Sequence, residues 1–180
     1  MAINSELLIK ACLRNESKAQ YEFYKAYYGF LKSVAMRYAG STDEAEDMLN
    51  EGFLKIFQNL HQYNFTGSFT SWMKTVMIHA AIDYTRKYKS YQNHVDMDSI
   101  SEYETESYQV NDALTKMDAE DVLALVQVLP PVSRAVFNLY VLEGYSHKEI
   151  AKQLNIKEGT SHWHLNFAKN EIKRKIQNKQ

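Results

Sequence analysis

Hydrophobic residues recur every three or four positions over most of the chain, which is the spacing of helices that bury one face. Three such runs cover residues 23–38, 45–60 and 69–80, and shorter runs lie near the N-terminus and beyond residue 118. Ser41, three residues before Glu44, is typical of a capped helix start and predicts where the second run begins. The pattern therefore predicts an all-α protein.

A polar and acidic segment without helical periodicity separates the helical runs at about residues 91–117. We interpret it as a flexible linker between two small helical domains, 1–90 and 118–180. The 180 residues suffice for this organisation, and the scarcity of turn residues, 2 Pro and 6 Gly, disfavours an all-β architecture with many turns.

Charge is distributed unevenly, although the formal net charge is only −1. Residues 72–90 carry four basic and one acidic side chain, and residues 144–180 carry eight basic and three acidic ones. Between them, residues 91–121 carry one basic and nine acidic side chains. Two basic segments on either side of an acidic one indicate a protein that binds a polyanion.

The C-terminal segment has the pattern of a helix-turn-helix motif. Ser146 and Glu149 predict a capping box, Ala151 is small enough for a close helix crossing, and Asn155 can adopt the left-handed conformation of a tight turn. A longer helix then begins near Gly159. Its basic character suits a helix that enters the DNA major groove. On its outer face we expect His162, Trp163, Asn166, Lys169 and Lys173.

Other kinds of site have little support. A single cysteine, Cys12, excludes an internal disulfide and a Cys-rich zinc site, and the six histidines lack metal-binding spacing. No phosphate-binding glycine loop or nucleophile motif occurs, so we expect neither a cofactor nor enzymatic chemistry. No apolar stretch approaches the length of a membrane span, so we expect a cytoplasmic protein without membrane insertion.

Four stretches resemble one protein family: DEAEDMLNEGFLKIFQNL, SFTSWMKTVMIHAAIDYTRK, LPPVSRAVFNLYVLEGYSHKEIAKQL and NIKEGTSHWHL. Their order is similar to that of extracytoplasmic-function (group 4) sigma factors of the sigma-70 family, the type with regions 2 and 4 alone. The resemblance implies a protein that binds core RNA polymerase, through its beta-prime and beta subunits, and directs it to promoter DNA. An anti-sigma factor is a further partner that the resemblance allows.

The helix at about 43–60 carries an outward stripe formed by Asp47, Asn50, Glu51 and Leu54. In the family, this stripe docks on the clamp helices of the beta-prime subunit. Without the resemblance, the same stripe would be read as a solvated helix face. Gly52 departs from the family pattern and weakens a helix by about 1 kcal/mol relative to Ala, for no reason visible in the sequence.

The resemblance assigns the next region to melting of the minus-ten element and to holding its non-template strand. Capture of single-stranded DNA needs flat side chains for the bases and cations for the phosphates. We expect Phe69 and Trp72 to be core residues, and His79 stands where the family commonly has Asn. The side chains that we assign to this role are Tyr63, Phe65, Lys74, His79, Arg86 and Lys87.

The helix-turn-helix corresponds to the part of the family that reads the minus-thirty-five element. Thr160 can hold a phosphate at the helix N-terminus; His162, Trp163 and Asn166 can approach base edges; and Lys169 and Lys173 can contact the DNA backbone. We also expect His164 near the edge of the groove. His162 and His164 stand where relatives often carry Lys or Arg. DNA phosphates favour the charged form of a histidine, so we expect DNA binding by the C-terminal domain to tighten as the pH falls from about 7.5 to 6.

Two other functions fit the same pattern. A free-standing helix-turn-helix regulator would bind duplex DNA alone, whereas a sigma factor would need polymerase. A helical adaptor would bind only protein.

Overall fold

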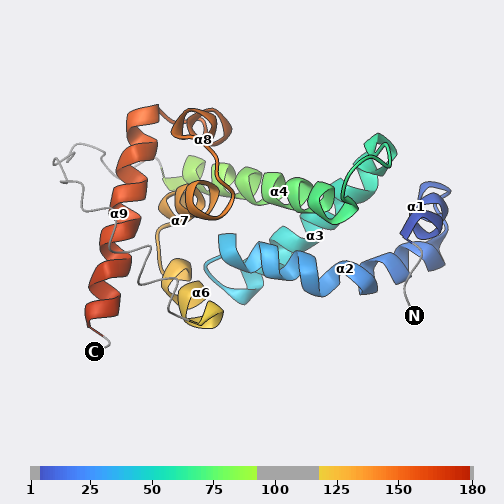
Figure 1. Cartoon of the computed structure of the whole chain (residues 1–180), viewed down its shortest axis with the longest axis horizontal. Coiled ribbons are helices and arrows are strands. Elements are labelled where there is room, and N and C mark those ends of the chain that lie inside the picture. Colours follow the sequence, from blue (N-terminus) through green and yellow to red (C-terminus); the bar gives the residue numbers. More distant parts are fainter. Residues whose placement is uncertain (1–4, 93–117, 179–180) are drawn as a thin grey trace. The chain divides into compact units, whose positions relative to one another are not determined.

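The computed structural model describes residues 5–92 and 118–178, and within them the protein consists of helices without strands (Figure 1). This confirms the predicted all-α fold. The acidic linker predicted at 91–117 lies outside the described residues from 93 onward. The elements are α1 (Ser5–Leu13), α2 (Ser17–Tyr38), α3 (Thr42–Asn59), η1 (Leu60–Gln62), α4 (Phe69–Gln92), α6 (Ala119–Gln127), α7 (Pro131–Phe137), η2 (Asn138–Leu142), α8 (His147–Leu154) and α9 (Glu158–Gln177).

The chain divides into two compact units. The first contains the residues up to 36 and residues 41–81; the second contains residues 37–40 and those from 82 onward. The division passes through the last turn of α2 and the middle of α4. Among the described helices, none is both long and apolar enough to cross a lipid bilayer.

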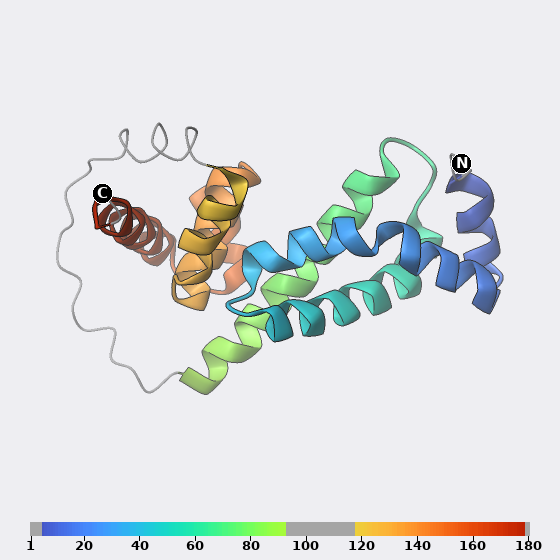
Figure 2. The same ribbon diagram turned by 90° about the horizontal axis from the view of Figure 1, so that it is seen from below.

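In the first unit, α2 and α3 run alongside each other and α4 crosses them (Figure 2). Their inward faces form a core without solvent access. Ring contacts join its helices: Phe23 of α2 packs within 5.2 Å of Phe57 of α3 and 5.8 Å of Phe69 of α4, between ring centroids. The largest fully buried side chains of this unit include Phe23, Leu31, Met48, Leu49, Ile56, Met73 and Met77.

Helix α3 begins where the sequence predicts. Ser41 has extended backbone angles, and its side chain accepts a hydrogen bond from the backbone N–H of Glu44 at 3.2 Å. Asp43 and Glu44 lie in the first turn, where the helix dipole favours negative charge. The Ser41 cap therefore fixes the residue at which α3 begins.

The structure supplies the reason for Gly52 that the sequence lacks. Gly52 lies on the buried face of α3, where a β-carbon would fall 2.8 Å from Cε of Met77, a residue of α4 without solvent access. The sulfur of Met77 would be closer still. The glycine thus gives Met77 room between α3 and α4, at a cost in helix propensity.

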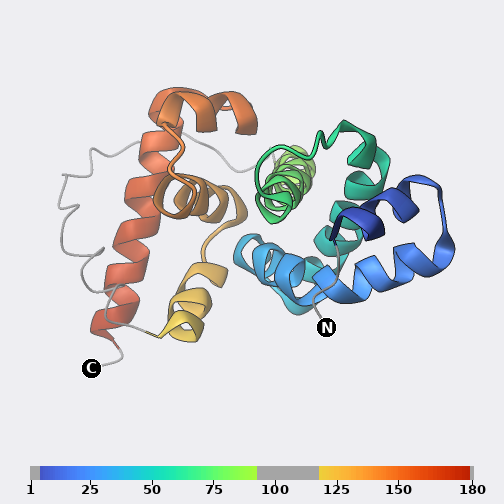
Figure 3. The ribbon, with the colours of Figure 1, turned by 45° about the vertical axis from the view of Figure 1, so that its right-hand side comes forward.

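In the second unit, α7 and α8 pack against one side of α9, and α6 lies beside the C-terminal half of α9 (Figure 3). Pro131 is the first residue of α7, a position that proline favours. After Phe137 the backbone widens into a π-helical turn, η2. Gly144 then ends it with a φ of +75°. Buried apolar residues of this unit are Leu125, Val126, Leu129, Val136, Phe137, Leu139, Ile150, Leu154, Leu165, Ala168 and Ile172.

Candidate nucleic-acid interface

The outward stripe on α3 has the exposure that its spacing predicts. Asp47, Asn50 and Leu54 are exposed, and Leu54 keeps 51% of its surface accessible. Glu51 is partly buried, with a carboxylate oxygen 3.9 Å from the ammonium nitrogen of Lys55. The stripe therefore presents one apolar side chain among carboxylates, a combination that suits a protein partner with apolar and basic groups.

A hydrogen-bond network beside this stripe fixes α2 against α3. The Lys32 ammonium donates to Glu46 at 2.5 Å and to the Tyr28 hydroxyl at 3.1 Å, and that hydroxyl donates to the same Glu46 oxygen at 2.8 Å. The hydrogen bond from Lys32 is the main cause that lowers the pKa of Glu46. The same bond raises the pKa of Lys32, so the pair is charged over the physiological range.

The loop between η1 and α4 is held by its own hydrogen bonds. The Tyr63 hydroxyl donates to the carbonyl of Gly67 at 3.0 Å, and the Asn64 side chain accepts from the N–H and the hydroxyl of Thr66. Phe65 adopts a left-handed φ of +61°, and the residue remains 43% exposed. An exposed ring on a loop of fixed shape is a surface on which an unstacked base can lie.

Aromatic rings continue from this loop onto α4. The Tyr63 ring lies 5.3 Å from Phe65, 4.8 Å from Phe69 and 5.7 Å from Trp72, between centroids. Phe69 is buried, as expected. Trp72 stacks on Phe69 at 5.7 Å but is only partly buried, so the expectation of a core tryptophan holds in part.

A lysine of another helix lies beside this loop. The Lys10 ammonium of α1 lies 5.9 Å from the centre of the Phe65 ring and 2.6 Å from a carboxylate oxygen of Glu6. α1 also packs against η1. No sequence pattern singles out Lys10, because this contact joins residues 55 positions apart in the chain.

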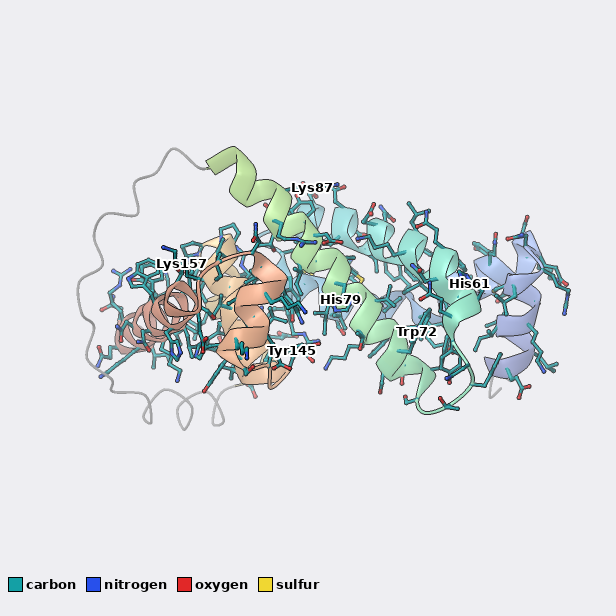
Figure 4. The ribbon with its side chains drawn as sticks, turned by 90° about the horizontal axis from the view of Figure 1, so that it is seen from above. His61, Trp72, His79, Lys87, Tyr145 and Lys157 are labelled. Atoms are coloured by element: carbon teal, nitrogen blue, oxygen red, sulfur yellow. The ribbon has the colours of Figure 1, made fainter. Side chains whose placement is uncertain are left out.

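The predicted polar positions of α4 lie at intervals along its length, and Figure 4 shows Trp72, His79 and Lys87 following one another. His79, Arg86 and Lys87 are exposed, and Lys74 is partly buried. Arg86 bonds to Asp83 one turn earlier. These side chains place cations at several positions along α4, as a helix that binds a phosphate backbone requires.

The helix-turn-helix is present with the predicted local structure. Ser146 and Glu149 form a complete capping box at the start of α8, and Asn155 ends α8 in the left-handed conformation, with a φ of 52°. The N–H of Ile156 donates to the carbonyl of Ala151 at 3.0 Å, which closes the tight turn. Figure 4 marks Lys157, the exposed residue that precedes α9.

The side chains predicted for the outer face of α9 differ in their exposure. His162 is exposed, whereas Thr160, Trp163, Asn166 and Lys173 are partly buried. Trp163 stacks on Phe167, one turn later on the same helix, at 5.3 Å between ring centroids.

Lys169 was expected to point outward, and this prediction is wrong. It keeps only 8% of its surface exposed, and burial lowers the pKa of its ammonium. The reason is that α9 packs against α6, α7 and α8, so its buried face is wider than that of a helix covered on one side. Lys169 stands next to buried Ala168 at the border of this wide face.

Histidines form cross-helix contacts that the sequence does not reveal. The His164 ring nitrogen Nδ1 lies 2.8 Å from the hydroxyl of buried Ser133 on α7, so His164 is anchored to α7 through this contact and is not simply a groove-edge residue. Nδ1 of buried His147 on α8 lies 2.9 Å from the Ser161 hydroxyl on α9. The two faces of the His147 ring stack on the rings of Tyr140 and His162.

No group of three or more His, Cys, Asp or Glu side chains within the described residues has the arrangement of a metal site. The geometry instead consists of exposed rings, cations and a helix-turn-helix. These features define a protein that binds nucleic acid and also presents a helix face to a protein partner.

Comparison with known proteins narrows this class. The family model for Sigma-70 region 2 matches residues 23–91, and the model for Sigma-70, region 4 matches residues 119–172. Together these models define a transcription initiation factor. The chain belongs to the sigma-70 family, as an extracytoplasmic-function (ECF) sigma factor.

Relatives of this group are distant in sequence. The ECF RNA polymerase sigma factor SigE of Mycolicibacterium smegmatis is 28% identical over 132 residues, 71% of this chain and 49% of that protein, so the chain spans about half of its length. The ECF RNA polymerase sigma-E factor of Escherichia coli strain K12 is 23% identical over 97% of this chain and 95% of its own. The sigma factor RpoE of Bartonella quintana, solved with the anti-sigma factor NepR, is 17% identical, with a TM-score of 0.49, over 87% of this chain and 96% of its own.

Proposed function

We propose that this ECF sigma factor binds core RNA polymerase through α3 and reads two promoter elements, one with each of its family regions. In this proposal residues 1–90 form the domain that binds polymerase and the minus-ten element, and residues 118–180 form the domain that binds the minus-thirty-five element. The observation that carries the proposal is the match of both family regions, in order, to segments with the corresponding helices.

The polymerase contact uses Asp47, Asn50, Glu51 and Leu54, which meet the clamp helices of the beta-prime subunit. The exposure of Asp47, Asn50 and Leu54 supports this assignment, as do the N-cap of α3 and its hydrogen bonds to α2. Leu54 supplies apolar area at the centre of the contact, and the carboxylates of Asp47 and Glu51 orient it. The beta subunit and, on family membership alone, an anti-sigma factor are further partners to test.

Strand capture at the minus-ten element uses the loop and α4. Phe65 and Tyr63 offer ring faces to unstacked bases, and Lys74, Arg86 and Lys87 neutralise phosphates of the same strand. His79 lies on the exposed side of α4 between these cations. The fixed loop supports this role because its shape exists before DNA arrives.

Duplex reading at the minus-thirty-five element uses the start of α9. Thr160, in the first turn, holds a phosphate, His162 and Asn166 face the bases together with the Trp163 ring, and Lys173 contacts the backbone. Lys169 is not among the DNA-contacting residues of this proposal, because its side chain is buried. The chain acts in the cytoplasm without chemistry of its own, because nucleotide addition belongs to the polymerase.

Run-off transcription with sigma-free core polymerase on fragments of the source genome tests the proposal. We expect discrete transcripts that appear only when this chain is present, and the mapped start sites should share two upstream motifs. Binding of the chain alone to those fragments measures the alternative of a free-standing regulator. Transcripts that do not depend on the chain, together with tight duplex binding in the absence of polymerase, would replace the proposed function by that alternative.

A further inference from the structure

Three rings from three elements form a stack at the start of the helix-turn-helix. His147, the first residue of α8, lies with its ring centroid 4.5 Å from that of Tyr140 on η2 and 3.7 Å from that of His162 on α9. The interplanar angles are 25° and 29°, so the rings lie nearly face to face. Both outer rings are exposed, whereas His147 between them keeps 9% of its surface.

The middle ring is held at its edge as well as at its faces. Its Nδ1 lies 2.9 Å from the hydroxyl of Ser161, which is fully buried at the beginning of α9. One hydrogen bond and two stacked faces leave His147 little freedom to turn. Because His162 follows Ser161 in the chain, the same contacts also set the direction of the His162 ring.

We propose that His147 and His162 form a coupled pair that carries at most one positive charge near neutral pH. In this pair, His147 positions His162 as the ring that is charged when α9 binds DNA. Two imidazolium ions stacked at this distance would repel each other strongly, with little water between them to screen the charges. The exposed member, His162, is the one whose charge water and DNA phosphates can stabilise. The inference rests on the proposed DNA-reading function of α9.

The charged and titratable groups around His147 agree with this division of roles. Burial is the main cause that lowers the pKa of His147. Of the nearby residues of α9, His162 and Lys169 lower this pKa further, whereas Glu158 raises it. Tyr140 of η2 covers the other face of the His147 ring. Burial and these neighbours together therefore favour the neutral form of His147.

Titration of the free, full-length chain tests the coupling without DNA. NMR resonances of the imidazole C–H groups give the pH midpoint of each histidine, and His147 is assigned by its loss in His147→Phe. In His162→Phe the stacked ring remains but its charge is removed, so we expect the midpoint of His147 to rise. Removal of His61, an exposed histidine of the first unit, by His61→Gln should leave it unchanged. An equal midpoint in wild type and His162→Phe would overturn the coupling.

Binding to DNA tests the positioning role. The probe is duplex DNA selected from a random pool by the wild-type chain in complex with core polymerase, and its affinity for that complex is measured at about pH 7.5 and 6. We expect wild type and His147→Phe to bind more tightly at the lower pH, with a log-log salt slope steeper by about 0.9 for one added phosphate contact. His162→Phe should lose this change.

The deciding variant is His147→Ala, which removes the stack but leaves His162 in place. We expect its pH response to fall to that of His162→Phe, while far-ultraviolet circular dichroism verifies that it is folded. A full wild-type response in His147→Ala would overturn the positioning role. If the wild-type complex selects no DNA, the proposed function fails, and the NMR comparison still decides whether the two rings are coupled.

Discussion

Replacing Gly52 by Ala should fail to give the stabilisation that this change gives elsewhere in a helix. In a helix interior, Ala is favoured over Gly by about 1 kcal/mol. At Gly52 the new methyl group would fall 2.8 Å from Cε of Met77 and closer to its sulfur. Met77 has no exposed surface, so its side chain can move only by displacing packed neighbours. Overpacking of this kind costs about 1–3 kcal/mol. We therefore expect Gly52→Ala to lower the free energy of unfolding by about 0–2 kcal/mol.

Gly29 provides a matched control for this change. It lies in α2, is exposed, and has no atom within 4 Å of the position that a β-carbon would take. Gly29→Ala should therefore raise the free energy of unfolding by about 0.5–1 kcal/mol. Urea unfolding of the full chain, followed by circular dichroism at 222 nm, compares the two variants.

A double-mutant cycle isolates the contact itself. Met77→Ala removes the atoms that oppose the new methyl group, and in that background Gly52→Ala should stabilise the chain, as it does at Gly29. The coupling between the two changes should then be about 2 kcal/mol. If Gly52→Ala alone stabilises the protein as much as Gly29→Ala does, the close approach of α3 to Met77 is not what keeps glycine at this position.

Three further outcomes follow from the structure. Glu51→Lys should weaken co-purification with core polymerase on the order of fivefold. Glu22→Lys, which reverses the charge of an exposed residue on α2, should not weaken it. Equal binding by the two variants would contradict docking through α3. Asn155→Val should lower the free energy of unfolding by about 1–2 kcal/mol because its φ is 52°, and Asn155→Gly should not; urea unfolding checks this, and equal losses would show that backbone strain is not the cause. The pKa of Glu46 is lowered in the folded protein, so this carboxylate stabilises the fold above its unfolded pKa of about 4.3. That contribution is lost as the pH falls through the folded pKa, so Glu46→Gln should reduce the change in the urea midpoint between about pH 6 and 3. An unchanged pH dependence would contradict a stabilising role of the Glu46 network.

Local features of the fold could be predicted because they depend on residues close together in the chain. The caps at Ser41 and Ser146 and the left-handed turn at Asn155 each involve a hydrogen bond or a backbone angle within a few positions. Helix periodicity likewise placed Asp47 and Leu54 outward. These are the features on which short-range geometry and side-chain chemistry act directly.

Features that depend on how many neighbours a helix has could not be predicted in the same way. Lys169 was assigned to an outer face because periodicity assumes one buried stripe, whereas α9 packs against three other helices. Gly52 and Met77 come from different helices, as do His147 and His162, and each pair meets only after folding. A single sequence contains no signal for such pairs, since their spacing along the chain has no period.

The hydrogen bonds within the loop from Tyr63 to Gly67 bear on how the protein could discriminate among DNA sequences. The conformational entropy of this loop is lost when the protein folds, so little of it remains to be lost on binding. A base that fits the Phe65 ring therefore gains nearly the whole stacking energy, while a base that does not fit cannot recruit a different loop shape. Loosening the loop, for example by Asn64→Ala, should make the protein more tolerant of altered minus-ten sequences at the same time as it weakens binding to the preferred one.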